Sequence, residues 1–305
     1  MSITLIENFR AVFYAPFYAP VALGAYEAEG LDVRIQASPE AAQTIDTLVA
    51  GEGEVSWGGL SRLMGGLSRS PARAPVAFCE VIGRDPFFLI GREPKPDFRL
   101  QDLVGSRIAI VSEVPAPWMC LRYDLTLAGI DPAQLQVISA HSMAENTDAL
   151  RNGEVDVIQV FHPYAHKLTA AGSGHVWYAA AARGPATYTT LNTTRDFAER
   201  EPEVLRAMCR AMYWSQQWIA RHDGRELARA VASFFPDIAP ALLAACFENY
   251  KTLGVWNETP VMSRAGFEWI RDAGLSNGRV PRRFSYAECV DMRFAEDAVT
   301  MTDQA

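Results

Sequence analysis

An internal repeat is the feature of this chain that most constrains its fold. Three landmarks recur in the same order at an offset of about one hundred residues: residues 48–55 with 150–157, 30–32 with 129–131, and 3–6 with 108–111. Each copy, residues 3–59 and 107–161, has the pattern strand, helix, strand, helix, strand, which is typical of a short parallel α/β unit. Two such units predict two lobes with a ligand cleft between them.

Composition narrows the class of protein. The 305 residues are 49% hydrophobic, which is enough for a sizeable core. The net charge of −8 and the pI near 5.2 argue against a nucleic-acid partner, which needs a basic face. The five cysteines are odd in number and widely spaced, without the paired spacing of zinc or redox sites.

The most apolar early stretch, residues 11–26, raises the question of a leader or a membrane span. Pro16 and Pro20 interrupt it, and an expected strand precedes it. We therefore interpret it as folded protein, and the chain is not expected to span a membrane. The sequence as given shows no export signal, so we expect either a cytosolic protein or a periplasmic one whose leader was removed.

The first copy predicts a strand at 3–7, an aromatic loop at 8–18, a helix at 19–29 that ends at Gly30, and a strand at 31–36. Ser38 and Pro39 indicate the start of a helix that runs to about residue 50. A strand at 55–57 and a helix at 60–67 complete this copy.

The extended run at 75–90 is long enough to pass from one lobe to the other. In the second copy, Ser142 and Glu145 form a capping box before a helix that ends at Gly153. Residues 177–182 and 187–191 are expected to form the return crossing, and 203–222 a long amphipathic helix, with further helices to about 274. Two crossings without a low-complexity linker predict a hinge.

Several motifs in order resemble a known family. They are Phe13-Tyr14-Ala-Pro-Phe17-Tyr18 with residues 21–33, RDPFFL at 84–89, DLVG at 102–105 followed by RIA, and GEVD at 153–156. Together, over about residues 3–275, they resemble ABC-transporter solute-binding proteins of the group that includes nitrate, sulfonate, taurine and hydroxymethylpyrimidine binders and the thiamine-pyrimidine synthases.

The resemblance implies an α/β, type II periplasmic-binding-protein fold, with two α/β lobes, a central ligand cleft and two crossover strands. Lobe one would be 1–88 plus 186–305, and lobe two 89–185. It also implies a small-molecule ligand and an ABC permease as partners, and no cofactor. The cysteine-rich stretch and early histidine of the pyrimidine synthases have no match here. The first loop also lacks the nucleophilic cysteine of a related aromatic desulfinase.

Ligands of open α/β sheets bind at the carboxyl ends of strands. That rule selects the segments 8–18, 57–62, 84, 113–118, 161–164 and 183–188. In the first of them, one cation and four rings could contact a flat ligand: Arg10, Phe13, Tyr14, Phe17 and Tyr18. The alternative is that the rings pack as ordinary core, and we expect roughly half of them to do so.

Trp57, Gly58 and Gly59 precede an expected helix N-terminus. Its free N–H groups and the Ser61 hydroxyl could hold a carboxylate, sulfonate or phosphate, and Arg62 could add positive charge. The alternative is a plain strand-to-helix turn that needs glycine for its backbone angles.

The corresponding loop of the second copy carries Glu113, Pro117 and Trp118. Trp118 could close over the ligand, or fold into its own lobe. Phe161 and His162 end the second copy, and His162 is expected to donate a hydrogen bond to the ligand. His162 and His166 lack a third ligand, so no metal site is predicted.

Arg84, Arg183 and Tyr188 lie on or beside the two crossings. An arginine there could grip an anion through two hydrogen bonds. For Arg84 the favoured alternative is a salt bridge with the adjacent Asp85. Cys120 follows an expected helix start but is interpreted as an inert core thiol.

No nucleophile–base pair, metalloprotease helix, phosphate-binding glycine loop or nucleophile elbow is present in the sequence. The first hypothesis is a solute-binding protein that closes on a polar or anionic, planar molecule, of the pyrimidine, aromatic carboxylate or sulfonate class. The alternative is a cytosolic lyase or decarboxylase that acts on a small aromatic acid through His162, Glu113 and Cys120. A regulatory effector domain is a third reading, but no DNA-binding segment is attached.

Overall fold

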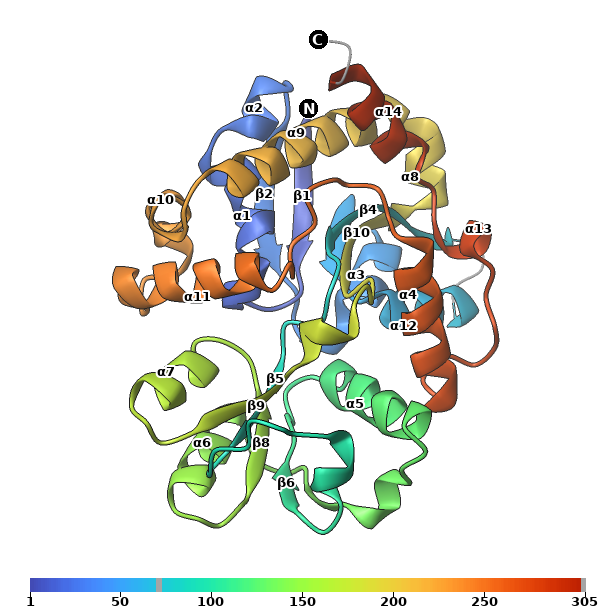
Figure 1. The fold of residues 1–305 in the computed structure, drawn as a ribbon. Coiled ribbons are helices and arrows are strands. Elements are labelled where there is room, and N and C mark those ends of the chain that lie inside the picture. Colours follow the sequence, from blue (N-terminus) through green and yellow to red (C-terminus); the bar gives the residue numbers. More distant parts are fainter. Residues whose placement is uncertain (70–72, 303–305) are drawn as a thin grey trace. The chain divides into compact units, whose positions relative to one another are not determined.

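The computed structural model describes residues 1–69 and 73–302. The chain divides into two compact units, unit 1 (Met1–Arg84 with Pro185–Ala305) and unit 2 (Asp85–Gly184). Each unit is an α/β structure with its own five-stranded sheet (Figure 1). The expectation of two α/β lobes is therefore confirmed.

The sheet of unit 1 is mixed. Its strands, in spatial order, are β2 (Asp32–Ala37), β1 (Ser2–Glu7), β3 (Val55–Gly58), β10 (Thr189–Thr194) and β4 (Pro75–Ile82). β1 pairs in parallel with β2 and β3, whereas β10 is antiparallel to β3 and β4. The carboxyl ends of β1, β3 and β4 therefore lie at the same edge of the sheet as the amino end of β10.

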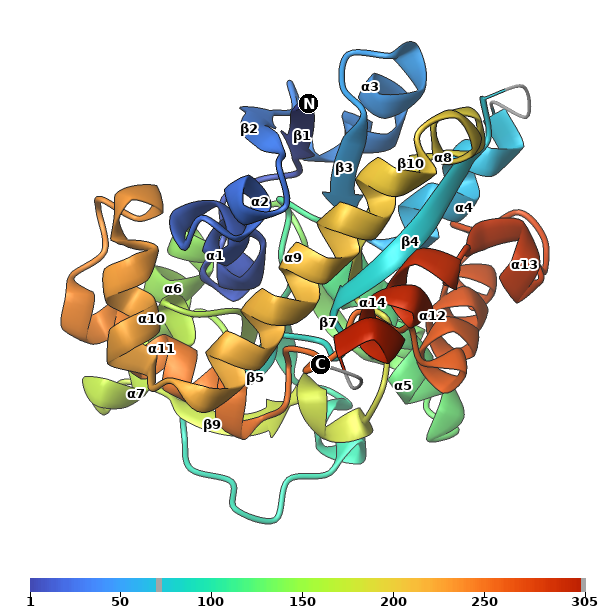
Figure 2. The ribbon, with the colours of Figure 1, turned by 90° about the horizontal axis from the view of Figure 1, so that it is seen from above.

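Helices cover both faces of this sheet (Figures 1 and 2). One face carries α1 (Ala15–Ala22), α2 (Ala25–Ala28), α9 (Pro202–Arg221) and α14 (Arg293–Thr302), and the other carries α3 (Thr44–Ala50), α4 (Leu60–Arg69) and α12 (Arg264–Ser276). The remaining helices of unit 1 are α8 (Arg195–Arg200), α10 (Gly224–Ala230), α11 (Pro240–Thr252) and α13 (Tyr286–Cys289). All residues of β4 are buried, as expected for a strand covered on both faces, and α9 packs with its apolar side inward.

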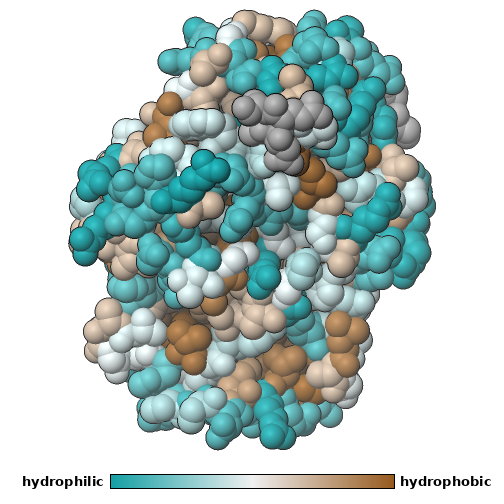
Figure 3. Space-filling model, turned by 45° about the horizontal axis from the view of Figure 1, so that its top comes forward, coloured by the Kyte–Doolittle hydropathy of each residue, from teal (hydrophilic) through white to brown (hydrophobic). Residues whose placement is uncertain are grey.

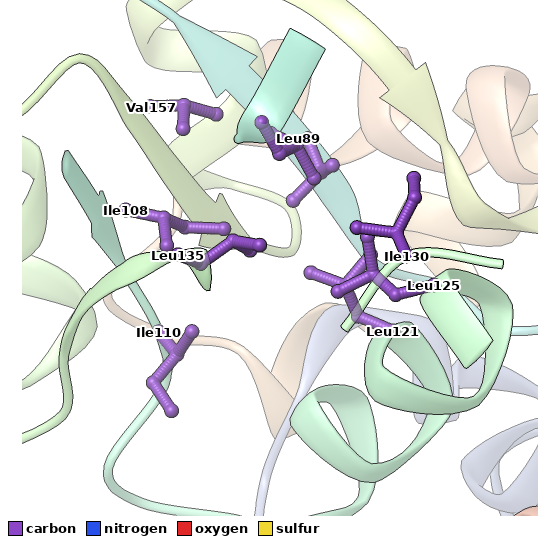
Figure 4. Close-up of a cluster of buried hydrophobic side chains, with 9 residues drawn as sticks. Leu89, Ile108, Ile110, Leu121, Leu125, Ile130, Leu135 and Val157 are labelled. Carbon is purple, nitrogen blue, oxygen red and sulfur yellow. The ribbon is translucent and has the colours of Figure 1, made fainter. Parts of the chain in front are cut away.

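Unit 2 repeats this plan on a smaller scale. Its sheet order is β7 (Gln136–Ile138), β6 (Arg107–Ala109), β8 (Val157–Val160), β5 (Phe88–Gly91) and β9 (His175–Ala179). Its helices are α5 (Ala116–Leu127), α6 (Met143–Arg151) and α7 (Tyr164–Ala170). Leucine, isoleucine and valine side chains from the strands, from α5 and from the segments that connect them form its core (Figure 4).

The repeat in the sequence is thus a repeat of topology. β1, β2 and β3 have the same order as β6, β7 and β8, and Leu5 faces Val55 as Ile108 faces Val157. Gly51 ends α3, and Gly153 follows α6, each with a positive φ that favours glycine. In both sheets the fourth position is filled by a strand that follows a crossing between the units, β10 in unit 1 and β5 in unit 2.

Other expectations are also confirmed. The run at 75–90 forms β4 and β5, one in each unit. Ser142 and Glu145 make the reciprocal hydrogen bonds of a capping box at the start of α6. The helix expected at 203–222 is α9.

Two expected helix starts are wrong. The aromatic segment 8–18 is not a loop, because a 3-10 turn (Val12–Tyr14) leads directly into α1, with Pro16 in the first turn, where no N–H is needed. Ser38 does not cap a helix, since its hydroxyl donates to the Glu40 carbonyl and α3 begins only at Thr44. Helices also continue past residue 274, to Thr302.

None of the helices within 1–69 and 73–302 is long and apolar enough to cross a membrane. On the face drawn in Figure 3, hydrophilic and hydrophobic residues are interspersed. The large hydrophobic side chains that are exposed are spread over both units: Met1, Val104, Leu127, Val176, Trp214 and Met301.

Candidate functional site

Arg62, in the first turn of α4, is the centre of a polar cluster at the carboxyl edge of the unit 1 sheet. Its Nη1 donates to Asn8 Oδ1 at 2.9 Å and to Thr44 Oγ1 at 3.5 Å. Asp46 is the acidic group whose charge acts on Arg62, but Asp46 forms its salt bridge with Arg69, at 2.7 Å. Among the residues that the structure describes, Arg62 therefore has neutral partners and no carboxylate partner.

Burial is the largest influence on this guanidinium. Burial lowers the pKa of Arg62, while the nearby phenol of Tyr14 acts in the opposite direction and the positive charge of Arg279 lowers it further. An arginine stays charged even so, because its ordinary pKa is above 12. Within residues 1–69 and 73–302, Arg62 is thus a partly buried positive charge that pairs with no carboxylate, and such a charge favours an incoming anion.

Asn8 is held in place by Tyr14. Asn8 Nδ2 donates to the Tyr14 hydroxyl at 3.1 Å, so its Oδ1 faces Thr44 and Arg62. Burial raises the pKa of Tyr14, which therefore remains a neutral phenol over the physiological range. The chain Tyr14–Asn8–Arg62 fixes the position of the guanidinium.

Two glycines, Gly58 and Gly59, lie beside the Arg62 site. A Cβ on Gly58 would lie 3.6 Å from Arg62 Nη1, and one on Gly59 would lie 3.5 Å from the Tyr188 carbonyl oxygen. Both distances are ordinary van der Waals contacts, so each glycine lies directly against the site. Ser61 is half-buried in the same turn. The two glycines thus lie beside Arg62, the residue that was expected to add positive charge at this turn.

The aromatic side chains of the first segment pack differently from the expectation. Phe13, Tyr14, Phe17 and Tyr18 are all at most 2% exposed, so all of them are core, and not about half. Trp57 is fully buried and stacks on Phe17 at a ring distance of 4.9 Å. These rings pack between α1 and β3. Among them, the Tyr14 hydroxyl contacts the polar cluster around Arg62, through Asn8.

Arg10 lies apart from this cluster. Its Nη2 pairs with Glu7 at 2.8 Å, and the guanidinium lies over the rings of Tyr18 and Phe234. Tyr188 is buried at the amino end of β10, where its ring meets the edge of Phe13 and its hydroxyl acts on the charge of Arg62. Of the candidates in unit 1, the structure brings together Tyr14, Gly58, Gly59, Ser61, Arg62 and Tyr188.

In unit 2 the candidate residues of the loop 113–118 make contacts within that unit. Glu113 Oε1 accepts the Met143 N–H at 2.8 Å, so its carboxylate covers the N-terminus of α6. The carbonyl of the buried Pro117 accepts from Gln159 at 2.9 Å, and Trp118 packs against the hydrophobic core.

Phe161 and His162 are buried in unit 2. Phe161 meets Phe87 edge to face at 5.2 Å, and the His162 ring lies 4.7 Å from that of Phe88. The rings of His162 and His166 are 6.2 Å apart. Throughout 1–69 and 73–302, no group of three or more histidine, cysteine, aspartate or glutamate residues could hold a metal ion.

The two arginines of the crossings have different roles. Arg183 Nη1 pairs with Asp85 at 2.6 Å, and its other nitrogens donate to Asp124, so a buried cation binds two buried carboxylates. The expected pair of Arg84 with Asp85 is therefore wrong, because Arg183 takes that carboxylate. Arg84 is half-buried beside Gly254 and its N–H points to the Val255 carbonyl.

The environment of the cysteines does not favour the thiolate. All five cysteines are buried. Burial raises the pKa of the Cys120 thiol well above its ordinary value, and that of Cys289 to about 12. A nucleophilic cysteine needs the opposite shift.

Sequence reasoning missed Asn8, Thr44 and Arg279. The rule for strand ends selected the segment 8–18 that begins with Asn8, but within that segment only Arg10 and the aromatic residues were named as candidates. Thr44 and Arg279 carry no local signal, since they approach α4 from other parts of the chain.

One family model matches more than half of the chain. The model of the family described as "NMT1/THI5 like" matches residues 13–225. YtlA of Bacillus subtilis (strain 168), which is named as a binding protein, is 24% identical over 96% of this chain and 89% of its own length.

Solved structures share the fold at low identity. The alkanesulfonate-binding protein SsuA from Xanthomonas axonopodis pv. citri, bound to MOPS, superposes with a TM-score of 0.70 at 15% identity, over 95% of this chain and 98% of that one. The ligand-binding component of an ABC-type import system from Staphylococcus aureus has a TM-score of 0.71 at 14% identity, over 98% and 99%.

Proposed function

The chain belongs to the NMT1/THI5-like family, and from that premise we propose that it captures a small anionic, planar solute whose charged group binds Arg62. A solute-binding protein of the ABC-import type is the assignment that the family match and the relatives support. The proposal adds the site and the chemical class of the ligand.

The observation that carries the proposal is the guanidinium of Arg62. Its side chain is held by Asn8 and Thr44, both neutral, and among the described residues no carboxylate pairs with it. Burying a charge without a counter-ion is costly, and a bound anion removes that cost. Guanidinium groups bind carboxylates and sulfonates or phosphates through two parallel hydrogen bonds.

The ligand classes expected from the sequence differ in how well they suit this site. An aromatic carboxylate or a sulfonate presents an anionic group that Arg62 can bind, whereas an uncharged pyrimidine presents none. The likeness to SsuA bound to MOPS, a sulfonate binder by name, supports the anionic classes. Planarity of the ligand remains a prediction from the sequence, because Tyr188 is buried like the other rings near Arg62.

Binding without chemistry is the second part of the proposal. All five cysteines are buried, burial raises the pKa of the Cys120 and Cys289 thiols, and the His162 ring packs against that of Phe88. A lyase or decarboxylase acting on a small aromatic acid would need a group of matched pKa at the ligand. Closure on the ligand remains a prediction, which small-angle scattering with and without ligand would test.

The experiment is thermal unfolding against benzoate, benzenesulfonate, nitrate and an uncharged pyrimidine. A ligand at about one hundred times its Kd adds roughly 2.7 kcal/mol of stability. The same measurement on Arg62→Gln should lose the shift, whereas Arg69→Gln, which removes an exposed arginine of the same helix, should keep it.

Chromatography of the mixture after incubation separates binding from turnover. An unchanged compound with a clear shift supports the binder. Consumption of the compound would establish the enzyme instead. A shift that survives Arg62→Gln would remove the site from the proposal.

A further inference from the structure

We propose that Arg279 forms a second cationic contact at the Arg62 site and that the pair selects a doubly charged anion over a singly charged one. This inference rests on the proposed function, since it assigns the charge class of the ligand at that site. It gives a role to a residue on a segment that the binding site does not otherwise use.

The position of Arg279 follows from how α12 packs on α4. A Cβ on Gly274, near the end of α12, would lie 3.8 Å from Ser61 Cβ. The chain then turns back, and the N–H of Arg279 donates to the Gly274 carbonyl at 2.9 Å. The main chain of Arg279 is therefore fixed beside the first turn of α4. The contact is at Ser61, the residue that precedes Arg62.

The charge of Arg279 is available. In the segment 264–283, Arg271 and Arg283 pair with Asp272, and Arg282 pairs with Glu288. Arg264 lies over the ring of Tyr286. Within that segment, all of which the structure describes, Arg279 is the arginine without an ion pair or a ring partner, and it is exposed.

The two cations act on each other. The charge of Arg279 lowers the pKa of Arg62, which means that their like charges are close enough to repel. Two arginines without counter-ions at one site favour an anion with two negative charges, because such an anion can neutralise both guanidinium groups. A phosphate monoester has a charge of about −1.5 to −2 at pH 7, since its second pKa is near 6. A sulfonate of the same shape carries a single charge.

The test compares phenyl phosphate with benzenesulfonate at pH 7.5, by calorimetry on the full chain. Wild type should bind phenyl phosphate more tightly, by about fivefold or more, which is the scale of one partly exposed charge pair. Arg279→Gln should remove this preference, because it should weaken the binding of phenyl phosphate more than that of benzenesulfonate. Arg62→Gln should weaken both ligands.

Arg283→Gln is the matched control, because it removes an exposed arginine of the same segment that already pairs with Asp272. It should keep the preference. Equal binding of the two ligands by wild type, or a preference that survives Arg279→Gln, would overturn the inference and leave the proposed function standing. Binding of neither ligand would overturn both.

Discussion

Arg62 Nη1 lies 2.9 Å from Asn8 Oδ1, so the cation at the edge of the unit 1 sheet is held by an amide where a carboxylate would neutralise it. The two residues are 54 positions apart in the chain. The choice of asparagine leaves the positive charge for a ligand. The predictions below start from this pair.

Asn8→Asp should convert the open site into a closed ion pair. The new carboxylate would neutralise Arg62, raise the stability of the unliganded protein and weaken anion binding by about tenfold or more, because charge-assisted hydrogen bonds are the stronger ones. Calorimetric titration and urea unfolding measure the two effects. Asn8→Ala is the control, and it should weaken binding without raising stability. Unchanged affinity in Asn8→Asp would contradict the role given to Arg62.

Arg183→Met should destabilise unit 2. It would leave Asp85 and Asp124 buried without their cation, at a cost of about 3–5 kcal/mol. The comparison is Arg107→Met, which breaks the more exposed pair with Asp156 and should cost about 0–1 kcal/mol. Urea unfolding followed by circular dichroism checks both. Equal losses in the two variants would show that burial of the Arg183 cluster does not matter.

Glu80 should make the stability of unit 1 depend on pH. Burial raises the pKa of this carboxyl, which accepts from Asn257 Nδ2 at 2.6 Å and from the Ser263 N–H at 3.2 Å. The folded state therefore holds the proton more tightly than the unfolded state does. The stability from this group is present below the ordinary glutamate pKa and is lost as pH rises through the folded value.

Glu80→Gln should flatten that part of the profile, measured as the free energy of unfolding between pH 4 and pH 8. Glu288→Gln serves as the opposite case, because hydrogen bonds and Arg282 hold the pKa of Glu288 at about 2. Its contribution is lost on the acid side. A wild-type profile that keeps its slope in Glu80→Gln would refute the assignment.

The cysteines should be unreactive in the folded protein. All five are buried, so iodoacetamide should add little mass under native conditions and five adducts in denaturant. Intact-mass spectrometry counts the adducts directly. Rapid native labelling of Cys120 would revive the hypothesis of thiol catalysis.

Much of the fold could be predicted from the sequence, because its signals are local or repeated. The repeat predicts both β-α-β-α-β units, and Gly51 with Gly153 marks equivalent helix ends. The capping box at Ser142 needs only four consecutive residues. The start of α1 at Ala15 lies within the segment 8–18 that was expected to be a loop, and Pro16 occupies a first turn that tolerates it.

The candidate site could be predicted only in part. Gly58, Gly59 and Arg62 lie together at a strand end, and the rule for ligand positions in α/β sheets selects them. Asn8 and Thr44 come from separate segments and contact Arg62 only through the fold, and the charge of Arg279 acts on it from a third segment. Alternation along β3 did not show that Trp57 faces the buried rings of α1, because a strand covered on both faces has no polar side.

The placement of β10 between β3 and β4 also fixes the order in which the two sheets can be completed during synthesis. Unit 2 is one contiguous segment, and its last strand ends at Ala179. The sheet of unit 1 lacks its fourth strand until Thr194 has been made, so β3 and β4 have no partner between them. On the ribosome, unit 1 is therefore the first unit whose synthesis begins and the last whose sheet is completed. The facing edges of β3 and β4 stay unpaired until all of unit 2 has been synthesised.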